Sequence, residues 1–249
     1  MLQDRPKKEE PFAKIFRRAF QAEKQGLEVQ RLEAGSVIWK DVRSELTLKA
    51  IYPSFSENIS ASNPNDSSGL IVLEEGNVIH GLWPGDLPVG TIATKLQGNR
   101  PKLMAGPHHG SPSDFKRGHR RELFRNSVAA ISPSIGFISV GTKNSYNHPR
   151  PGYLSLLAHH GCRLACSQIT TACDRIHLRN EVPVFDGSGA LGLRSPRTGT
   201  PCRGALRLRL ANGLLAPDEF FEIHRSRVAS LRRPQCLKGC GWKKGDPIP

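Results

Sequence analysis

The sequence has 249 residues, of which 37% are hydrophobic, and its 36 Lys and Arg against 22 Asp and Glu give a formal net charge of +14. This length supports one well-buried domain and a small appendage. No segment approaches the roughly 18 apolar residues of a membrane span, and the first residues lack the apolar core of a signal peptide, so we expect a soluble, cytoplasmic chain without a membrane partner. The positive charge favours DNA or RNA, or else reflects background composition.

The first third of the chain is predicted to form a helix followed by strands. Apolar residues recur at helical spacing between positions 12 and 20, and Gly26 ends this pattern, which predicts an amphipathic helix. Strands are predicted at 27–32, 36–40 and 46–52, before a polar loop at 53–65. A hairpin is predicted from strands at 69–73 and 78–83 around the turn at Gly76.

Helices and strands alternate in the middle of the chain. Helices are predicted at 88–97, 113–126 and 150–160, and strands at 102–106, 135–140 and 163–169. This alternation predicts a layered α/β fold. Beyond about residue 182 the chain is rich in Gly, Ser and Pro, with a strand predicted at 205–210 and a helix at 217–231. We therefore expect one domain at 1–182 and a basic C-terminal appendage with its linker at 183–249.

Polar motifs follow three of the predicted strands. Gly85-Asp86 follows the second hairpin strand, His108-His109-Gly110 follows the strand at 102–106, and Asn144 and His148 follow the strand at 135–140. Because loops after neighbouring strands meet at one edge of a sheet, an acid and several imidazoles are expected to share that edge.

With Asn65-Asp66-Ser67-Ser68 upstream, this order of motifs resembles the metallo-β-lactamase-fold hydrolase domain of ComEC-type DNA-uptake proteins, over roughly residues 27 to 180. The resemblance implies an αββα sandwich and a metal-dependent hydrolase acting on phosphodiesters or nucleic acid, with Zn²⁺ or Mn²⁺. The histidine-rich H-x-H-x-D-H loop of that family has no counterpart here, and no histidine precedes His80. The chain thus resembles the C-terminal part of such a domain, truncated at its N-terminal side.

The resemblance also implies roles for single residues. Asp86 and His108 correspond to metal ligands, because a carboxylate can bridge two cations and an imidazole suits zinc or manganese. His109 and His148 correspond to catalytic positions that orient a ligand, bind a phosphate oxygen or transfer a proton. The remaining positions would bind substrate: Asn65, Asp66, Ser67, Ser68 and Asn144.

Each motif also has a purely structural interpretation. Asp86 could cap the following helix, the segment 65–68 could form a turn, and the loop at His148 could simply lead into a helix. The pair His108-His109 could be solvated on its loop. For His159-His160, at a predicted helix end, the structural interpretation is favoured.

The expected metal shell is incomplete. Asp86 and one histidine make two ligands, whereas a catalytic zinc normally has about three protein ligands. The sequence therefore leaves three possibilities: a hydrolase with a weak metal site, an inactive remnant or nucleic-acid-binding module, or a chain whose partner segment supplies the missing ligands.

The six cysteines form two groups in the sequence. Cys162, Cys166 and Cys173 lie close together, and a second group contains Cys202, Cys236 and Cys240. Neither group has the C-x-x-C spacing of a structural zinc site. We expect reduced thiols.

Overall fold

The computed structural model describes residues 13–28, 30, 32–115, 120–141 and 146–170, and beyond these only 173, 202, 208–211, 214–217, 228–229, 231, 234 and 236. The chain divides into two compact units, Met1–Leu32 and Glu33–Pro249. The first unit contains helix α1 (Ala13–Lys24), as the apolar pattern predicts. The predicted domain boundary at 182/183 lies outside the described residues.

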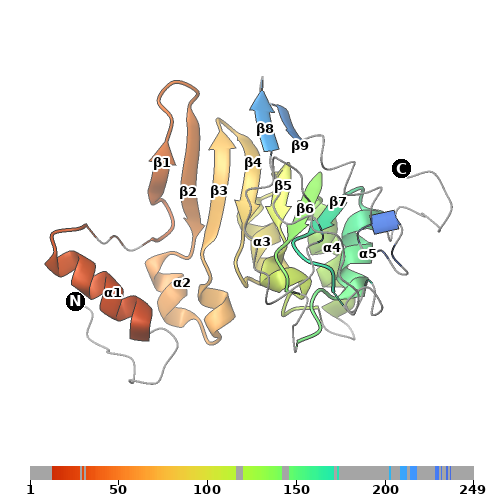
Figure 1. Ribbon diagram of the computed structural model, residues 1–249, viewed down its shortest axis with the longest axis horizontal. Helices are drawn as coiled ribbons and strands as arrows, with labels where there is room; N and C mark the ends of the chain where they lie inside the picture. Colours follow the sequence, from red (N-terminus) through yellow and green to blue (C-terminus); the bar gives the residue numbers. More distant parts are fainter. Residues whose placement is uncertain are drawn as a thin grey trace. The chain divides into compact units, whose positions relative to one another are not determined.

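The second unit contains a seven-stranded sheet whose strands follow one another in chain order from β1 to β7 (Figure 1). Its first four strands form an antiparallel meander: β1 (Val37–Lys40), β2 (Leu46–Tyr52), β3 (Leu70–Glu75) and β4 (Val78–Trp83). Between β2 and β3 lie the helix α2 (Phe55–Ser60) and the 3₁₀ turn η1 (Pro64–Ser67). The predicted hairpin is confirmed, with Gly76 in its turn.

The remaining strands of this sheet are parallel. β5 (Leu103–Ala105) pairs with β4, β6 (Ile135–Ile138) with β5, and β7 (Arg163–Cys166) with β6. The connections contain α3 (Val89–Leu96), the 3₁₀ segment η2 (Pro107–Gly110), α4 (Arg120–Ile131) and α5 (Pro151–His159). The sheet is thus mixed and the fold class is α/β. None of the described helices is both long and apolar enough to cross a membrane.

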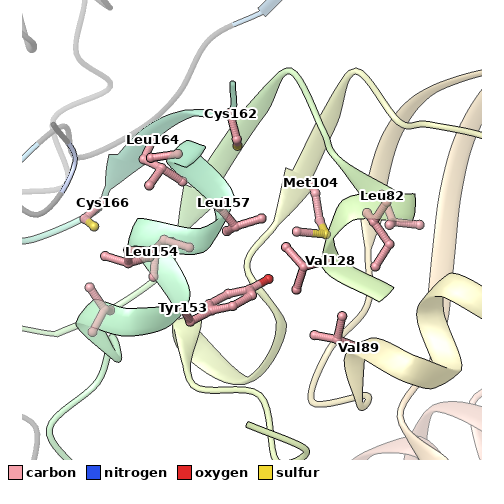
Figure 2. Close-up of a cluster of buried hydrophobic side chains, with 14 of the residues drawn as sticks. Leu82, Val89, Met104, Val128, Tyr153, Leu154, Leu157, Cys162, Leu164 and Cys166 are labelled. Carbon is pink, nitrogen blue, oxygen red and sulfur yellow. The ribbon is translucent and has the colours of Figure 1, made fainter. Parts of the chain in front are cut away.

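The main core lies between this sheet and helices α3, α4 and α5 (Figure 2). Leu82 and Met104 of the sheet pack with Val89 of α3, Val128 of α4 and Leu154 of α5, and all five side chains are almost fully buried. A smaller cluster contains Leu103, Ile135 and Ala165, which alternate in sequence with the core residues of β5, β6 and β7. Burial of alternate positions in this way is typical of parallel strands, which are covered on both faces.

Three sequence-based expectations about elements are wrong. The described residues of 27–32 form no strand; Leu27 and Leu32 are largely exposed. The polar loop at 53–65 contains α2, whose N-terminus is closed by a capping box between Ser54 and Glu57. The helix expected at 113–126 is displaced, since residues 113–115 are not helical and α4 continues to Ile131, where the chain meets Ser132-Pro133.

The C-terminal region has a two-stranded antiparallel sheet of β8 (Leu208–Ala211) and β9 (Leu214–Pro217). Strand β8 overlaps the expected strand at 205–210, whose first residues lie outside the described part of the chain. Pro217 ends β9, and most of the expected helix at 217–231 also lies outside the described residues.

Candidate functional site

The polar motifs lie at the carboxyl ends of three neighbouring parallel strands. Asp86 follows β4, His108 follows β5, and Ser139 and His148 follow β6. The 3₁₀ turn η1 lies at the same edge. It directly precedes β3, and Ile71 at the start of this antiparallel strand pairs with Trp83 at the end of β4. In open α/β sheets, ligands bind outside the carboxyl ends of the strands, so this edge is the candidate site.

The loop after β5 has an unusual backbone. Three consecutive residues, His108, His109 and Gly110, have positive φ angles of 47°, 54° and 79°, and Gly85 in the neighbouring loop has a φ of 56°. For histidine this left-handed conformation costs free energy, which the surrounding structure must offset. The backbone N–H of His108 donates to the carbonyl of Gly85 at 2.9 Å. This bond holds the residue before Asp86 against His108.

The loop after β6 is tied to the same turn. The backbone N–H of Arg150 donates to the carbonyl of Gly110 at 2.9 Å, and its side-chain Nε–H donates to the hydroxyl of Ser111 at 3.1 Å. A Cβ at Gly110 would lie 2.7 Å from Cβ of Pro149, which leaves room only for glycine. The β5 and β6 loops therefore form one packed unit.

Three imidazoles meet in this unit. The ring centroids of His108 and His148 are 5.4 Å apart in an edge arrangement, and those of His109 and His148 are 6.5 Å apart with nearly parallel planes. Tyr146 stacks on His148 at 5.7 Å. His108 and His148 are half-buried and His109 is exposed, so both solvent and a ligand can reach the cluster.

The hydrogen bonds of two imidazoles define their chemistry. His109 Nδ1 lies 2.7 Å from the carbonyl of Ser139, and since a carbonyl only accepts, Nδ1 carries the proton. In the neutral ring Nε2 then holds the lone pair and can accept a proton. His108 Nδ1 lies 3.4 Å from the side-chain amide nitrogen of Asn65; since this NH₂ group only donates, Nδ1 accepts, and in the neutral ring Nε2 carries the proton.

His148 has a perturbed ionisation. Burial lowers its pKa below the ordinary value of 6.5, and the nearby His108, Arg150 and His109 lower it further, whereas Asp86 acts in the opposite direction. The neutral form of His148 therefore predominates at neutral pH. The bond from His108 to Gly85 holds Asp86 beside the histidine cluster.

The segment 65–68 contributes to the site mainly through Asn65. The backbone carbonyl of Asp66 accepts from the Tyr52 hydroxyl at 2.6 Å, which anchors the turn to β2. Ser68 packs against Gly85, where an added Cβ would lie 3.1 Å from the Ser68 Cβ. Asn144 lies outside the described residues. The rings of His159 and His160 meet edge to face at the C-terminal end of α5, while the site adjoins its N-terminal end.

The described residues at this edge do not form a complete metal shell. Within the part of the chain that the structure describes, no group of three or more His, Cys, Asp or Glu side chains is arranged to hold a metal ion. Asp86 and His108 are neighbours, but they do not make a complete shell. His80, buried in β4 and bonded through Nε2 to Glu75 at 3.2 Å, leaves its Nδ1 without a hydrogen bond.

Sequence reasoning missed Arg150, Ser111 and Ser139. Arg150 follows the His148-Pro149 motif directly, and a basic residue beside a histidine loop was the available signal. The contributions of Ser111 and Ser139 depend on hydrogen bonds between loops and carry no sequence signal.

The comparisons with known proteins give no further identification. No family model matches the chain, and neither curated proteins nor solved structures give a significant match. The mixed α/β class follows from the sheet and its helices. The resemblance to the metallo-β-lactamase fold rests on the sequence motifs alone.

Proposed function

We propose that this chain is a phosphodiester-directed hydrolase related to the metallo-β-lactamase fold, with the substrate-binding and proton-transfer part of the site present and the metal shell incomplete. The convergence of Asp86, the left-handed turn at His108-His109 and the His148 loop on one sheet edge carries the proposal. Strained backbone at non-glycine residues is concentrated at functional sites. In this interpretation the seven-stranded sheet is one of the two sheets of an αββα sandwich.

The charge of the site suits a phosphodiester. The Arg150 guanidinium is exposed, and its bond to Ser111 fixes the direction of the group. Guanidinium groups pair with phosphate oxygens through several N–H donors. The Nε2–H of the neutral His108 ring adds a further donor at this edge. A singly charged phosphodiester therefore fits better than a neutral substrate.

His109 is suited to act as the general base. Its Nε2 has the lone pair, the ring is exposed, and the Ser139 carbonyl fixes its orientation. A water molecule that attacks phosphorus would transfer its proton to this nitrogen. The leaving oxygen needs a proton donor, and the lowered pKa of His148 makes the protonated form scarce at neutral pH. Substrates with an acidic leaving group should therefore react fastest.

The described residues do not complete a metal site, so no step is assigned to an ion. By resemblance, Asp86 and His108 would be two ligands, and further ligands would have to come from residues outside the described part of the chain or from a partner segment. Mn²⁺ is a suitable probe, because it prefers carboxylate and imidazole ligands over thiolates.

The test is hydrolysis of bis(p-nitrophenyl) phosphate, whose leaving group is acidic, by the full chain with and without Mn²⁺. We expect His109→Gln to lower turnover about 100-fold, the lower bound for loss of a general base. Any stimulation by Mn²⁺ should disappear in Asp86→Asn. His159→Gln, at the exposed end of α5, is the control and should match the unmodified chain. Equal turnover in His109→Gln and the unmodified chain would contradict the proposal.

A non-catalytic nucleic-acid-binding module is the second candidate, and the net charge of +14 favours it. Of the basic residues that follow the histidine loop, Arg121 is exposed on α4, as is Arg125 one turn later. Binding that weakens steeply with salt, with no turnover, would support this function. Further basic residues have at least their side chains outside the described part: Lys116, Arg117, Arg120, Arg225, Arg232 and Arg233.

A further inference from the structure

Four cysteines from distant parts of the sequence meet beside the end of β7. Cys166 is the last residue of this strand, and its Sγ lies 3.7 Å from Sγ of Cys236, which is 70 positions later in the chain. Cys202 is held beside them, because its backbone N–H donates to the carbonyl of Ser167 at 3.0 Å. Cys173 interacts electrostatically with both Cys166 and Cys236.

This cluster is buried. The exposed fractions of Cys166, Cys173, Cys202 and Cys236 are 1%, 2%, 3% and 4%. All four belong to the main hydrophobic core, and none is in a disulfide. Cys166 belongs to the sheet, and Cys202 and Cys236 belong to the C-terminal region. The thiols therefore lie where described residues of that region contact the sheet.

We propose that Cys166, Cys173, Cys202 and Cys236 bind a zinc ion once their side chains turn toward a common centre, at a site separate from the histidine cluster and independent of its proposed function. Zinc binds four thiolates tetrahedrally at about 2.3 Å, and the sulfur–sulfur edge of such a tetrahedron is about 3.8 Å. The separation of Cys166 and Cys236 matches that edge. The Thr170 hydroxyl, also buried, donates to Sγ of Cys173 at 3.9 Å, as outer partners of metal thiolates do.

The thiols do not yet form a finished ion-binding group. Zinc binding requires each thiol to lose its proton and the side chains to turn toward a common centre, and both changes are normal when metal binding is coupled to folding. The hydrogen bond with Cys236 lowers the pKa of Cys166, but burial and the neighbouring Cys202 and Cys173 outweigh it and raise that pKa overall. The pKa of Cys236 is raised, mainly by its bond to Cys166.

Metal content of the full chain tests the proposal. After purification under reducing conditions and dialysis, we expect one zinc per chain. Cys202→Ser and Cys236→Ser should each lower zinc affinity at least about 100-fold, the upper range for loss of a mere outer partner. Cys236→His should retain zinc, because a Cys₃His set also binds it tetrahedrally. The matched control is Cys162→Ser, since Cys162 is equally buried but bonds to the Arg163 carbonyl.

A second measurement does not depend on the folding of variants. Co²⁺ added to the metal-free unmodified chain should give thiolate-to-cobalt charge-transfer absorption and the intense visible bands of a tetrahedral ion, both abolished by one equivalent of Zn²⁺. A chain without bound zinc and without this spectrum would overturn the proposal, as would a Cys166–Cys236 disulfide formed under the same conditions. Zinc that is lost in Asp86→Asn but kept in Cys236→Ser would place the ion at the histidine site and would equally overturn it.

Discussion

The left-handed turn at His108, His109 and Gly110 determines where the imidazoles of the candidate site lie. The two histidines are adjacent in this tight turn, but their side chains contact different residues. His108 contacts Asn65, and His109 contacts the carbonyl of Ser139. Gly110 closes the turn against Pro149 and Ile138. The cost of this conformation is offset by the packing of the β6 loop around it.

Gly110→Ala should destabilise the protein strongly. An L-residue in the left-handed region costs about 1–2 kcal/mol, and the clash with Pro149 adds about 1–3 kcal/mol of overpacking. Gly76→Ala is the matched control, because Gly76 has a φ of 55° and nothing within 4 Å of an added Cβ, so only the first cost applies. Urea denaturation of both variants gives the difference. Equal losses would show that the turn is not packed against Pro149 in solution.

His148 should make stability depend on pH. Its folded-state pKa lies below the unfolded value of 6.5, so above that value both states are neutral and the group has no effect on stability. As the pH falls through 6.5 toward the folded pKa, the unfolded state takes up protons first and the folded state loses stability. His148→Gln should therefore lose less stability than the unmodified chain between about pH 7.5 and pH 5. Parallel pH profiles in urea denaturation would contradict the lowered pKa.

Much of the candidate site could be predicted from single residues. Asp86, His108 and His148 each follow an apolar run, and that pattern places them at strand ends without knowledge of the fold. The left-handed turn could not be predicted, because only its third residue is a glycine. The tautomer of His109 could not be predicted either, since it depends on a carbonyl 30 positions away in the sequence.

At the scale of elements, Asp114 connects the site to α3. Its carboxylate accepts from the backbone N–H of Val89 at 3.1 Å and of Gly90 at 2.9 Å, the first residues of that helix. Pro88 at the N-cap supplies no side-chain acceptor, so Asp114 acts as the cap from a distant loop. These two hydrogen bonds connect the loop after η2 to α3, the helix that follows Asp86.

Asp114→Ala should therefore cost about 1–2 kcal/mol, the usual effect of removing a helix cap. Asp114→Asn retains one oxygen acceptor and should cost less. The specific readout is hydrogen exchange, in which the amides of Val89 and Gly90 should lose protection before the rest of α3. Asp41→Ala, at an exposed turn, should leave that protection unchanged. Unaltered exchange at Val89 and Gly90 in Asp114→Ala would rule out the cap.

Element prediction succeeded where local pattern and tertiary structure agree. Strands β2 and β4 have the predicted boundaries, because runs of β-forming residues between turn residues define both. The helix expected from 113 starts later, because Asp114 bonds to α3 and its loop cannot be helical. Helix α2 was missed although Ser54 and Glu57 form a capping box, since six residues are too few for a periodic signal.

At the scale of the whole molecule, the sheet changes from antiparallel to parallel pairing at β4, and the candidate site lies at that edge. Alternating helices and strands made the α/β class predictable, whereas the order of strands depends on long-range pairing. The thiol cluster was unpredictable for the same reason. Its members belong to two groups in the sequence and meet only in the folded chain.

We propose that the loops after β4, β5 and β6 together bind a phosphodiester. The most direct test is an NMR titration of the imidazole resonances with the dinucleotide TpT, with His→Gln variants for assignment. We predict that His109 and His148 shift along one binding curve, while His159 and His160 do not move and uncharged trimethyl phosphate has no effect. Shifts of equal size at His159, or none at His109 and His148, would contradict the claim.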